Sequence, residues 1–325
     1  MQRQYTCQGS PAARQRSQLA MATGIQKLLF VDTNIWLDFY RARNEAYLEL
    51  LEKVEAMKAK IIVTHQLETE YKANRQSVIL ESVAELKRKE PSPIPSIGVL
   101  AQAQQFRMLS KDIASATKRI KTLQDRLIAL IEKPAETDPV YQACQRIFHK
   151  NDALVLTRDD KDSEKRKEIR ERAQRRFFHG CPPRKRNDSS YGDAINWEWM
   201  VDCSISKAAE LVIVSRDTDY GVTYNKKSYI NDHLRHEFSN RVSQRRELLL
   251  YTKLSDALKH FHVPVSPAQV RAEDELFEEQ ALMAAATDFE VIPEAESPPT
   301  AVMTRPRRTF PAKYFTARKH GSKSE

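Results

Sequence analysis

Two unbroken apolar runs, far apart in the chain, define the framework of the predicted fold. Leu28–Val31 and Leu211–Val214 contain no polar residue, and each is followed by carboxylates. Because neither run alternates apolar with polar residues, each predicts a central strand of a parallel sheet that helices cover on both faces. We expect these strands over 28–32 and 211–215, and a further strand over Ile61–Val63.

Apolar residues at helical spacing lie between the strands. Residues 47–57 carry them three and four positions apart, which predicts a helix. Thr64 is expected to cap a second helix, which continues until the prolines of 91–95 stop it. Strands and helices that alternate in this way predict an α/β fold, with a central parallel sheet in a three-layer α/β/α arrangement.

The longest regular pattern lies in the middle of the chain. A helix from about Val99 to Glu132 would be roughly 50 Å long at about 1.5 Å per residue, longer than the core sheet is wide. We therefore interpret 65–132 as an antiparallel helical hairpin that projects from the core, within an insert of about 77–180. A helical bundle packed flat over the sheet is the alternative. The apolar positions that step by four and three are Leu109, Ile113, Ala116, Ile120, Leu123, Leu127 and Leu130.

Composition narrows the class of protein. With 325 residues and 41% hydrophobic residues, the chain can bury the core of one enlarged domain. Its formal net charge of +9 suggests a polyanionic partner, nucleic acid before membrane. No apolar stretch approaches the roughly 20 residues that cross a bilayer. The four cysteines show neither CxxC nor zinc-finger spacing, so a reducing cytoplasm fits them best.

Both ends of the chain differ from the middle. The first residues are polar and acid-free, so we expect 1–24 to be a disordered leader rather than a transit peptide. The predicted core domain is 25–263. Segment 264–325 should form a helix near Gln269–Ala284 and then a disordered tail, which is basic from Arg305 to Lys323.

Acidic residues directly follow the two central strands. Asp32 comes after the first strand, and Asp217 and Asp219 come after the other. The carboxyl ends of parallel strands lie on one edge of a sheet, where such sheets bind ligands. Carboxylate oxygens are hard ligands that suit Mg²⁺ and Mn²⁺, and like charges so close would repel without a cation. The two segments therefore predict a split metal site.

A further acid, Asp193, lies in the first turn of a predicted helix over 193–209. The helix dipole favours an acid there, which is a purely structural explanation. The functional explanation is that a right-handed crossover into the strand at 211 places it beside the sheet edge. A basic segment, Arg184, Lys185 and Arg186, stands shortly before it. Phosphate contact and simple surface charge both explain that segment.

Four short motifs follow one another along the chain. They are Asp32-Thr33-Asn34 after the first strand, Glu70 on the helix after the second, Asp193 opening a helix, and Ser215 to Tyr220 after a later strand. In order and local context this set resembles that of PIN-domain nucleases, and 176–197 is similar to a subgroup of larger, stand-alone bacterial PIN-like proteins. The resemblance covers roughly 27–262, and the helical insert is not among its specific parts.

The resemblance implies a PIN-like fold and a metal-dependent phosphodiesterase, most simply an endoribonuclease that cleaves RNA with a metal-activated water. A non-catalytic nucleic-acid-binding or scaffold protein that keeps the fold, and a DNA nuclease, are the alternatives. RNA or single-stranded DNA, an antitoxin protein and a second copy of the chain are the expected partners. The implied ligands of one or two Mg²⁺ or Mn²⁺ ions are Asp32, Glu70, Asp193 and Asp217, with Asp219 as a further ligand and Asn34 and Ser215 as polar supports.

Two assignments have rivals in the sequence. Glu68 competes with Glu70, but the spacing from Leu67 puts Glu70 with the core-facing row of the helix. Segment 153–160 imitates the last motif and offers Asp159, but it precedes Asp193 and runs into a charged helix. We therefore favour Glu70 and Asp217.

Overall fold

The computed structural model describes most of the chain between Ile25 and Glu290. The described residues are 25–95, 97–100, 102–157, 163–184, 191–225 and 227–290, with side chains through Leu282. The predicted disordered leader, the basic tail, Lys185, Arg186 and Asp159 lie outside them. Within the described part of the chain, no helix is both long and apolar enough to span a membrane.

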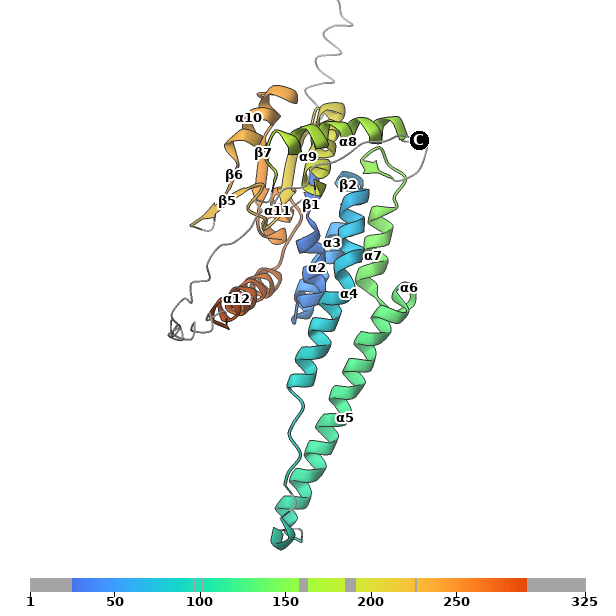
Figure 1. The fold of residues 1–325 in the computed structure, drawn as a ribbon, viewed down its shortest axis with the longest axis vertical. Coiled ribbons are helices and arrows are strands. Elements are labelled where there is room, and N and C mark those ends of the chain that lie inside the picture. The colour runs from blue at the N-terminus through green and yellow to red at the C-terminus, as the bar shows by residue number, and fades with distance from the viewer. Residues whose placement is uncertain are drawn as a thin grey trace, which may run out of the picture. The chain divides into compact units, whose positions relative to one another are not determined.

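A parallel sheet of three strands lies at the centre of the fold (Figure 1). Its order is β1 (Lys27–Val31), β4 (Glu210–Val214) and β7 (Leu248–Tyr251). Leu28 pairs with Leu211, so the two predicted apolar runs are neighbours in register. All of β4 is buried, and β1 is buried beyond its half-buried Lys27. The prediction of central parallel strands covered by helices is confirmed.

Two short strands extend this arrangement beyond β1. Strand β2 (Val63–Thr64) pairs in parallel with β3 (Val155–Leu156). A parallel bridge between Leu29 and Ile61 places the segment leading into β2 on the edge of β1 opposite β4. The carboxyl ends of β1 to β4 therefore face the same edge of the assembly. The described start of the segment that imitates the last motif therefore contains a strand of the fold, β3.

Helices connect and cover the strands. Asp32 is the N-cap of the helix after β1, and Thr64 caps the helix after β2 by accepting a hydrogen bond from the Leu67 N–H at 3.0 Å. The helices around the sheet are α2 (Thr33–Arg41), α3 (Glu45–Ala56), α6 (Pro134–Thr137), α7 (Pro139–Phe148), α8 (Ser163–Phe178), α9 (Gly192–Lys207), α10 (Asp232–Arg241) and α11 (Leu254–His260). Short 3₁₀ turns span Lys58–Lys60 and Gly98–Leu100.

The inserted helical hairpin is confirmed. Helix α4 (His65–Arg88) and helix α5 (Gln104–Glu132) run side by side and extend away from the sheet (Figure 1). No residue of α5 is buried, which a helix packed flat over the sheet would not show. Helix α5 begins at Gln104 rather than at Val99, because a 3₁₀ turn occupies Gly98–Leu100 instead. Its 29 residues give a length of about 44 Å.

Three strands, β5 to β7, were not predicted from the sequence. A two-stranded antiparallel hairpin, β5 (Gly221–Tyr224) and β6 (Lys227–Ile230), follows β4 directly. It requires glycine at position 221, because a Cβ there would lie 2.0 Å from the Tyr229 carbonyl oxygen. The third strand of the main sheet, β7, was also missed.

The C-terminal helix α12 (Pro267–Glu290) is longer than the sequence pattern suggested. The chain divides into two units within this helix, between Gln280 and Ala281. In the first unit, the Glu273 carboxylate accepts from the Leu254 and Ser255 N–H groups at 2.6 and 3.0 Å, and so caps α11. The predicted domain boundary at residue 263 stays a prediction.

A buried ion pair joins the hairpin to the core. The Arg75 side chain on α4 and the Asp138 side chain before α7 are 5% and 1% exposed. Tyr40 of α2 donates its hydroxyl to Asp138 at 2.8 Å, and Arg75 donates to the Leu130 carbonyl of α5 at 2.6 Å. Since every partner comes from a different element, these contacts fix the base of the hairpin against α2.

Replacing Arg75 with Ala should destabilise the protein strongly. The Asp138 carboxylate would then stay buried without its partner, and removing one member of such a pair costs about 3–5 kcal/mol. Arg146→Ala is the matched control, because its pair with Glu55 is exposed (52% and 24%) and should contribute about 0–1 kcal/mol. Urea unfolding followed by circular dichroism measures both losses, and equal losses would contradict this role of Arg75.

Candidate active site

The carboxyl ends of β1 and β4 bring the first acid and the last motif together. The Ser215 hydroxyl donates to Asp32 Oδ2 at 2.5 Å, and the Asp217 N–H donates to Ser215 Oγ at 3.0 Å. The Asp32 N–H in turn donates to the Val214 carbonyl at 2.9 Å, which continues the ladder between the two strands. Ser215 therefore links the Asp32 carboxylate to the backbone of Asp217.

Asn34 forms a second link between the same acids. It lies in the first turn of α2, and its Nδ2 donates to Asp32 Oδ2 at 3.1 Å and to Asp217 Oδ1 at 3.3 Å. Its Oδ1 is buried and has no hydrogen-bond partner among the residues that the structure describes. The amide oxygen is therefore an unused acceptor beside two carboxylates.

Glu70 joins the cluster from α4. Thr33 donates its hydroxyl to Glu70 Oε2 at 3.1 Å, and Gln66 donates to Glu70 Oε1 at 2.7 Å. The start of α9 packs closely here, because a Cβ on Gly192 would lie 2.7 Å from Glu70 Oε1. Glycine at this position thus lets the helix that carries Asp193 approach the Glu70 carboxylate.

Four acids act electrostatically on the buried Tyr220 hydroxyl. Burial raises its pKa well above the ordinary value, and Asp193, Asp32, Glu70 and Asp217 raise it further, in that order. The hydroxyl has no hydrogen-bond partner within the described residues. Hydrogen bonds through Thr33, Asn34 and Ser215 join three of these acids, Asp32, Glu70 and Asp217. Asp193 and Asp219 are half-buried and also interact with other groups.

Asp32 is the most perturbed acid of the cluster. Burial raises its pKa to about 6, and the charges of Asp217 and Glu70 act in the same direction. Hydrogen bonds from Ser215 and from the Thr33 N–H lower the pKa but do not cancel the rise. The free energy of folding is therefore less favourable when Asp32 is ionised.

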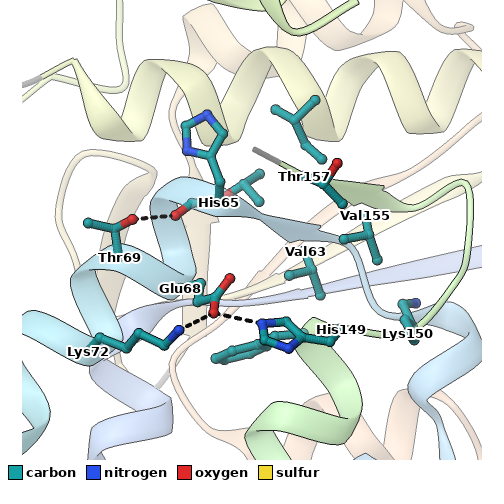
Figure 2. A pocket seen from close by; sticks show the side chains of 12 residues that line it. Val63, His65, Glu68, Thr69, Lys72, His149, Lys150, Val155 and Thr157 are labelled. Carbon is teal, nitrogen blue, oxygen red and sulfur yellow. Dashed lines mark hydrogen bonds and ion pairs between the residues drawn. The ribbon is translucent and has the colours of Figure 1, made fainter. Parts of the chain in front are cut away.

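Glu68, the rival of Glu70, faces another direction. Its Oε1 accepts from Lys72 at 2.5 Å and from His149 Nε2 at 2.8 Å (Figure 2). Burial alone would raise the Glu68 pKa, but these two hydrogen bonds outweigh it and the pKa is lowered. The structure places Glu70, and not Glu68, beside Asp32. Its catalytic role stays a prediction.

The basic segment is described only at its start. Arg184 is exposed, lies over the Phe177 ring at 4.6 Å, and donates to the Phe177 carbonyl at 3.3 Å. Buried Arg176 holds the preceding turn by donating to the Pro182 carbonyl and to Glu198. The start of the segment is thus anchored to α8 and α9.

The cluster consists of oxygen ligands, which suit Mg²⁺ and Mn²⁺. Among the described residues, no three His, Cys, Asp or Glu side chains meet closely enough to hold one metal ion. The Asn34 amide and the Thr33 and Ser215 hydroxyls stand between the acids as hydrogen-bond donors. A bound cation would neutralise the carboxylates in place of these donors. The Asn34 Oδ1 atom provides one more oxygen that could contact the cation. The residues therefore fit a divalent cation in their chemistry, with side-chain movement required.

Sequence reasoning missed three residues of this site. Thr33 and Gln66 each hold Glu70, and Tyr220 is the buried group that the acids surround. Gln66 stands four residues before Glu70 on one helix, a spacing that could have indicated the bond. Thr33 and Tyr220 lie within the first and last motifs, but their roles could not be predicted because their partners are distant in the chain.

Comparison with known proteins adds one finding. A family model described as PIN domain matches residues 29–220, which is more than half of the chain. No curated protein and no solved structure matches the chain. The matched residues include all four clustered acids, the hairpin α4–α5 and Tyr220.

The raised pKa of Asp32 predicts a pH-dependent stability of the metal-free protein. Its folded-state pKa, about 6, lies above the unfolded value, so the folded state binds more protons between about pH 4 and about pH 6. Stability should therefore fall as pH rises through this window. Asp32→Asn removes the effect and should gain about 1–3 kcal/mol relative to wild type between about pH 4 and about pH 7. Urea unfolding in a chelator measures it, and parallel pH curves would contradict it.

Proposed function

The chain belongs to the PIN-domain family, and from this premise we propose that it is a metal-dependent phosphodiesterase that cleaves RNA internally. PIN domains have a nuclease-type fold and act in general on nucleic acid. The observation that carries the proposal is the hydrogen-bond network of Thr33, Asn34 and Ser215 that joins the carboxylates of Asp32, Glu70 and Asp217, next to the start of the helix that carries Asp193. Like charges brought together in this way oppose folding, so their presence favours a function that needs the charges.

We infer that these four acids bind one or two Mg²⁺ or Mn²⁺ ions, with Asp219 as a further ligand. When bound, the cation supplies Lewis acidity at the scissile phosphate. Ser215 and Asn34 orient the Asp32 carboxylate, and Asn34 also orients Asp217. Thr33 and Gln66 fix one Glu70 oxygen each. Four hydrogen-bond donors thus fix the orientation of three carboxylates. Carboxylates that are already oriented need to reorganise less during the reaction.

A second class of function remains distinguishable by experiment. A scaffold protein that only keeps the fold has no need of the acids, whereas this chain keeps all four. The net charge of +9 supports a nucleic-acid substrate but does not choose between RNA and DNA. A cytoplasmic location, an antitoxin partner and a second copy of the chain stay predictions.

The direct test incubates the purified protein with labelled RNA, single-stranded DNA or duplex DNA, in Mn²⁺ or in a chelator. We expect RNA cleavage in Mn²⁺ only. Asp32→Asn or Asp193→Asn should reduce cleavage by about 10³-fold or more, because each removes a charge that the cation needs. Asp232→Asn is the matched control, since this aspartate on α10 is 98% exposed.

Full activity in both acid variants would contradict the site, and cleavage in chelator would contradict metal dependence. A second pair of variants tests the position of the last motif. Asp217→Asn should abolish cleavage, and Asp159→Asn should not. The reverse result would move the motif to the segment that follows β3.

The basic segment makes a separate prediction for binding. If Arg184, Lys185 and Arg186 contact phosphates, replacing all three with Ala should weaken RNA binding. The slope of log affinity against log salt should flatten by roughly 0.7 for each lost contact on a single strand. Base preference should hardly change, because phosphate contacts carry no sequence information. An unchanged slope and affinity in a filter-binding titration would show that the segment is solvated surface.

A further inference from the structure

A pocket of about 510 Å³ lies on the side of α4 that carries Glu68. Small-molecule sites usually measure roughly 300–1,000 Å³, so the pocket has room for a nucleotide-sized ligand. It lies at the carboxyl ends of β2 and β3 and against the first turns of α4 (Figure 2). None of the predicted catalytic residues lines it.

The floor of the pocket is apolar. Val63, Phe148, Val155 and Leu156 line it, and their residues belong to the buried core. Its walls carry polar groups from α4 and from the chain after α7, including Lys72, Thr69 and His149. An apolar floor with a few placed polar groups suits a flat ring with a polar edge.

The Glu68 carboxylate lines the pocket and can accept a hydrogen bond from a ligand. Lys72 and His149 hold its Oε1, whereas Oε2 has no hydrogen-bond partner in the described part of the chain. Figure 2 shows the second oxygen turned away from Lys72 and His149. The carboxylate is thus fixed in place with one oxygen open to a ligand, and the Lys72 ammonium stands next to it as a donor. A ligand that fits must combine N–H donors with an adjacent acceptor.

The pocket is close to the acids along the sheet edge. Neighbouring strands lie about 4.8 Å apart, so the ends of β2 and β3 are about one and two strand spacings from the end of β1, where Asp32 stands. Glu68 and Glu70 leave the same helix on different sides, one toward the pocket and the other toward Asp32. A strand whose phosphate lies at the acids could therefore place a neighbouring base in the pocket.

We propose that this pocket binds a guanine base of the substrate strand. Guanine carries the O6 acceptor next to the N1 and N2 N–H donors, so this edge can donate to the open Glu68 Oε2 while O6 accepts from Lys72. Its flat rings would cover the apolar floor. The inference rests on the proposed function for its biological meaning, because it gives the nuclease a base preference next to the cut.

Binding of mononucleotides tests the pocket without any cleavage. The probes are guanosine, inosine and adenosine 5′-monophosphates, titrated by calorimetry into the full chain in a chelator. We expect guanosine monophosphate to bind about five-fold or more tightly than adenosine monophosphate, with inosine monophosphate between them because it lacks the N2 amino group. Equal affinity for all three would overturn the guanine assignment.

Variants assign the preference to the side chain. Glu68→Gln should remove the guanosine preference, and Lys72→Met should weaken guanosine monophosphate binding about two-fold or more by removing the donor to O6. Glu81→Gln is the matched control, because this glutamate lies on the same helix, outside the pocket, and its side chain is 64% exposed. A preference that survives Glu68→Gln would overturn the proposal.

Cleavage of short RNAs in Mn²⁺ separates this inference from the proposed function. Wild type should cleave an RNA with a single guanine faster than the same RNA with inosine there, and Glu68→Gln should lose this difference. If no RNA is cleaved but guanosine monophosphate binding depends on Glu68, the pocket stands and the nuclease proposal fails. If RNA is cleaved without any guanine preference, the pocket assignment fails alone.

Discussion

Carboxylates that gather at one sheet edge, with Asp32 buried and the others half-buried, repel one another, and the arrangement of their neighbours follows from that repulsion. Asp32 is 3% exposed, and burial raises its pKa to about 6. Ser215, Asn34 and the Thr33 N–H all donate to it, which offsets part of the cost of its charge. A cation is the group that would offset the rest, so a site for divalent metal is the simplest account of the cluster.

Contacts outside the site hold the segment that carries Ser215 and Asp217 in place. Arg216, between Ser215 and Asp217, pairs with Asp38 at 2.5 Å, donates to the Asn34 carbonyl at 3.3 Å and lies over the Phe277 ring at 5.1 Å. Gln280 donates to the same aspartate at 2.9 Å. Phe277 and Gln280 belong to α12, beyond residues 29–220 that match the family. Helix α12 therefore contacts Arg216 and Asp38, which lie next to the clustered acids in the chain and in space.

The sequence predicted what depends on local pattern. Unbroken apolar runs identified β1 and β4, and the acids after them lie together because parallel strands end at a common edge. The short strand β7 was missed because a run such as Leu248–Leu250 is too short to distinguish from a loop or helix. Glu68 and Glu70 point in different directions because they stand two residues apart on α4, as the helical spacing predicted. Their partners His149 and Thr33 are far away in the chain, so the spacing could not predict them. The pocket is formed by residues far apart in the chain, such as Glu68 and His149, so no local sequence pattern could predict it.

The most direct measurement is the anomalous scattering of manganese in a crystal of this protein soaked in Mn²⁺. The account predicts a peak between Asp32 and Asp217, with the Asn34 amide rotated so that its oxygen faces the ion, and loss of the peak in Asp32→Asn. A well-ordered site without any manganese peak, at a pH above the pKa of Asp32, would contradict the account.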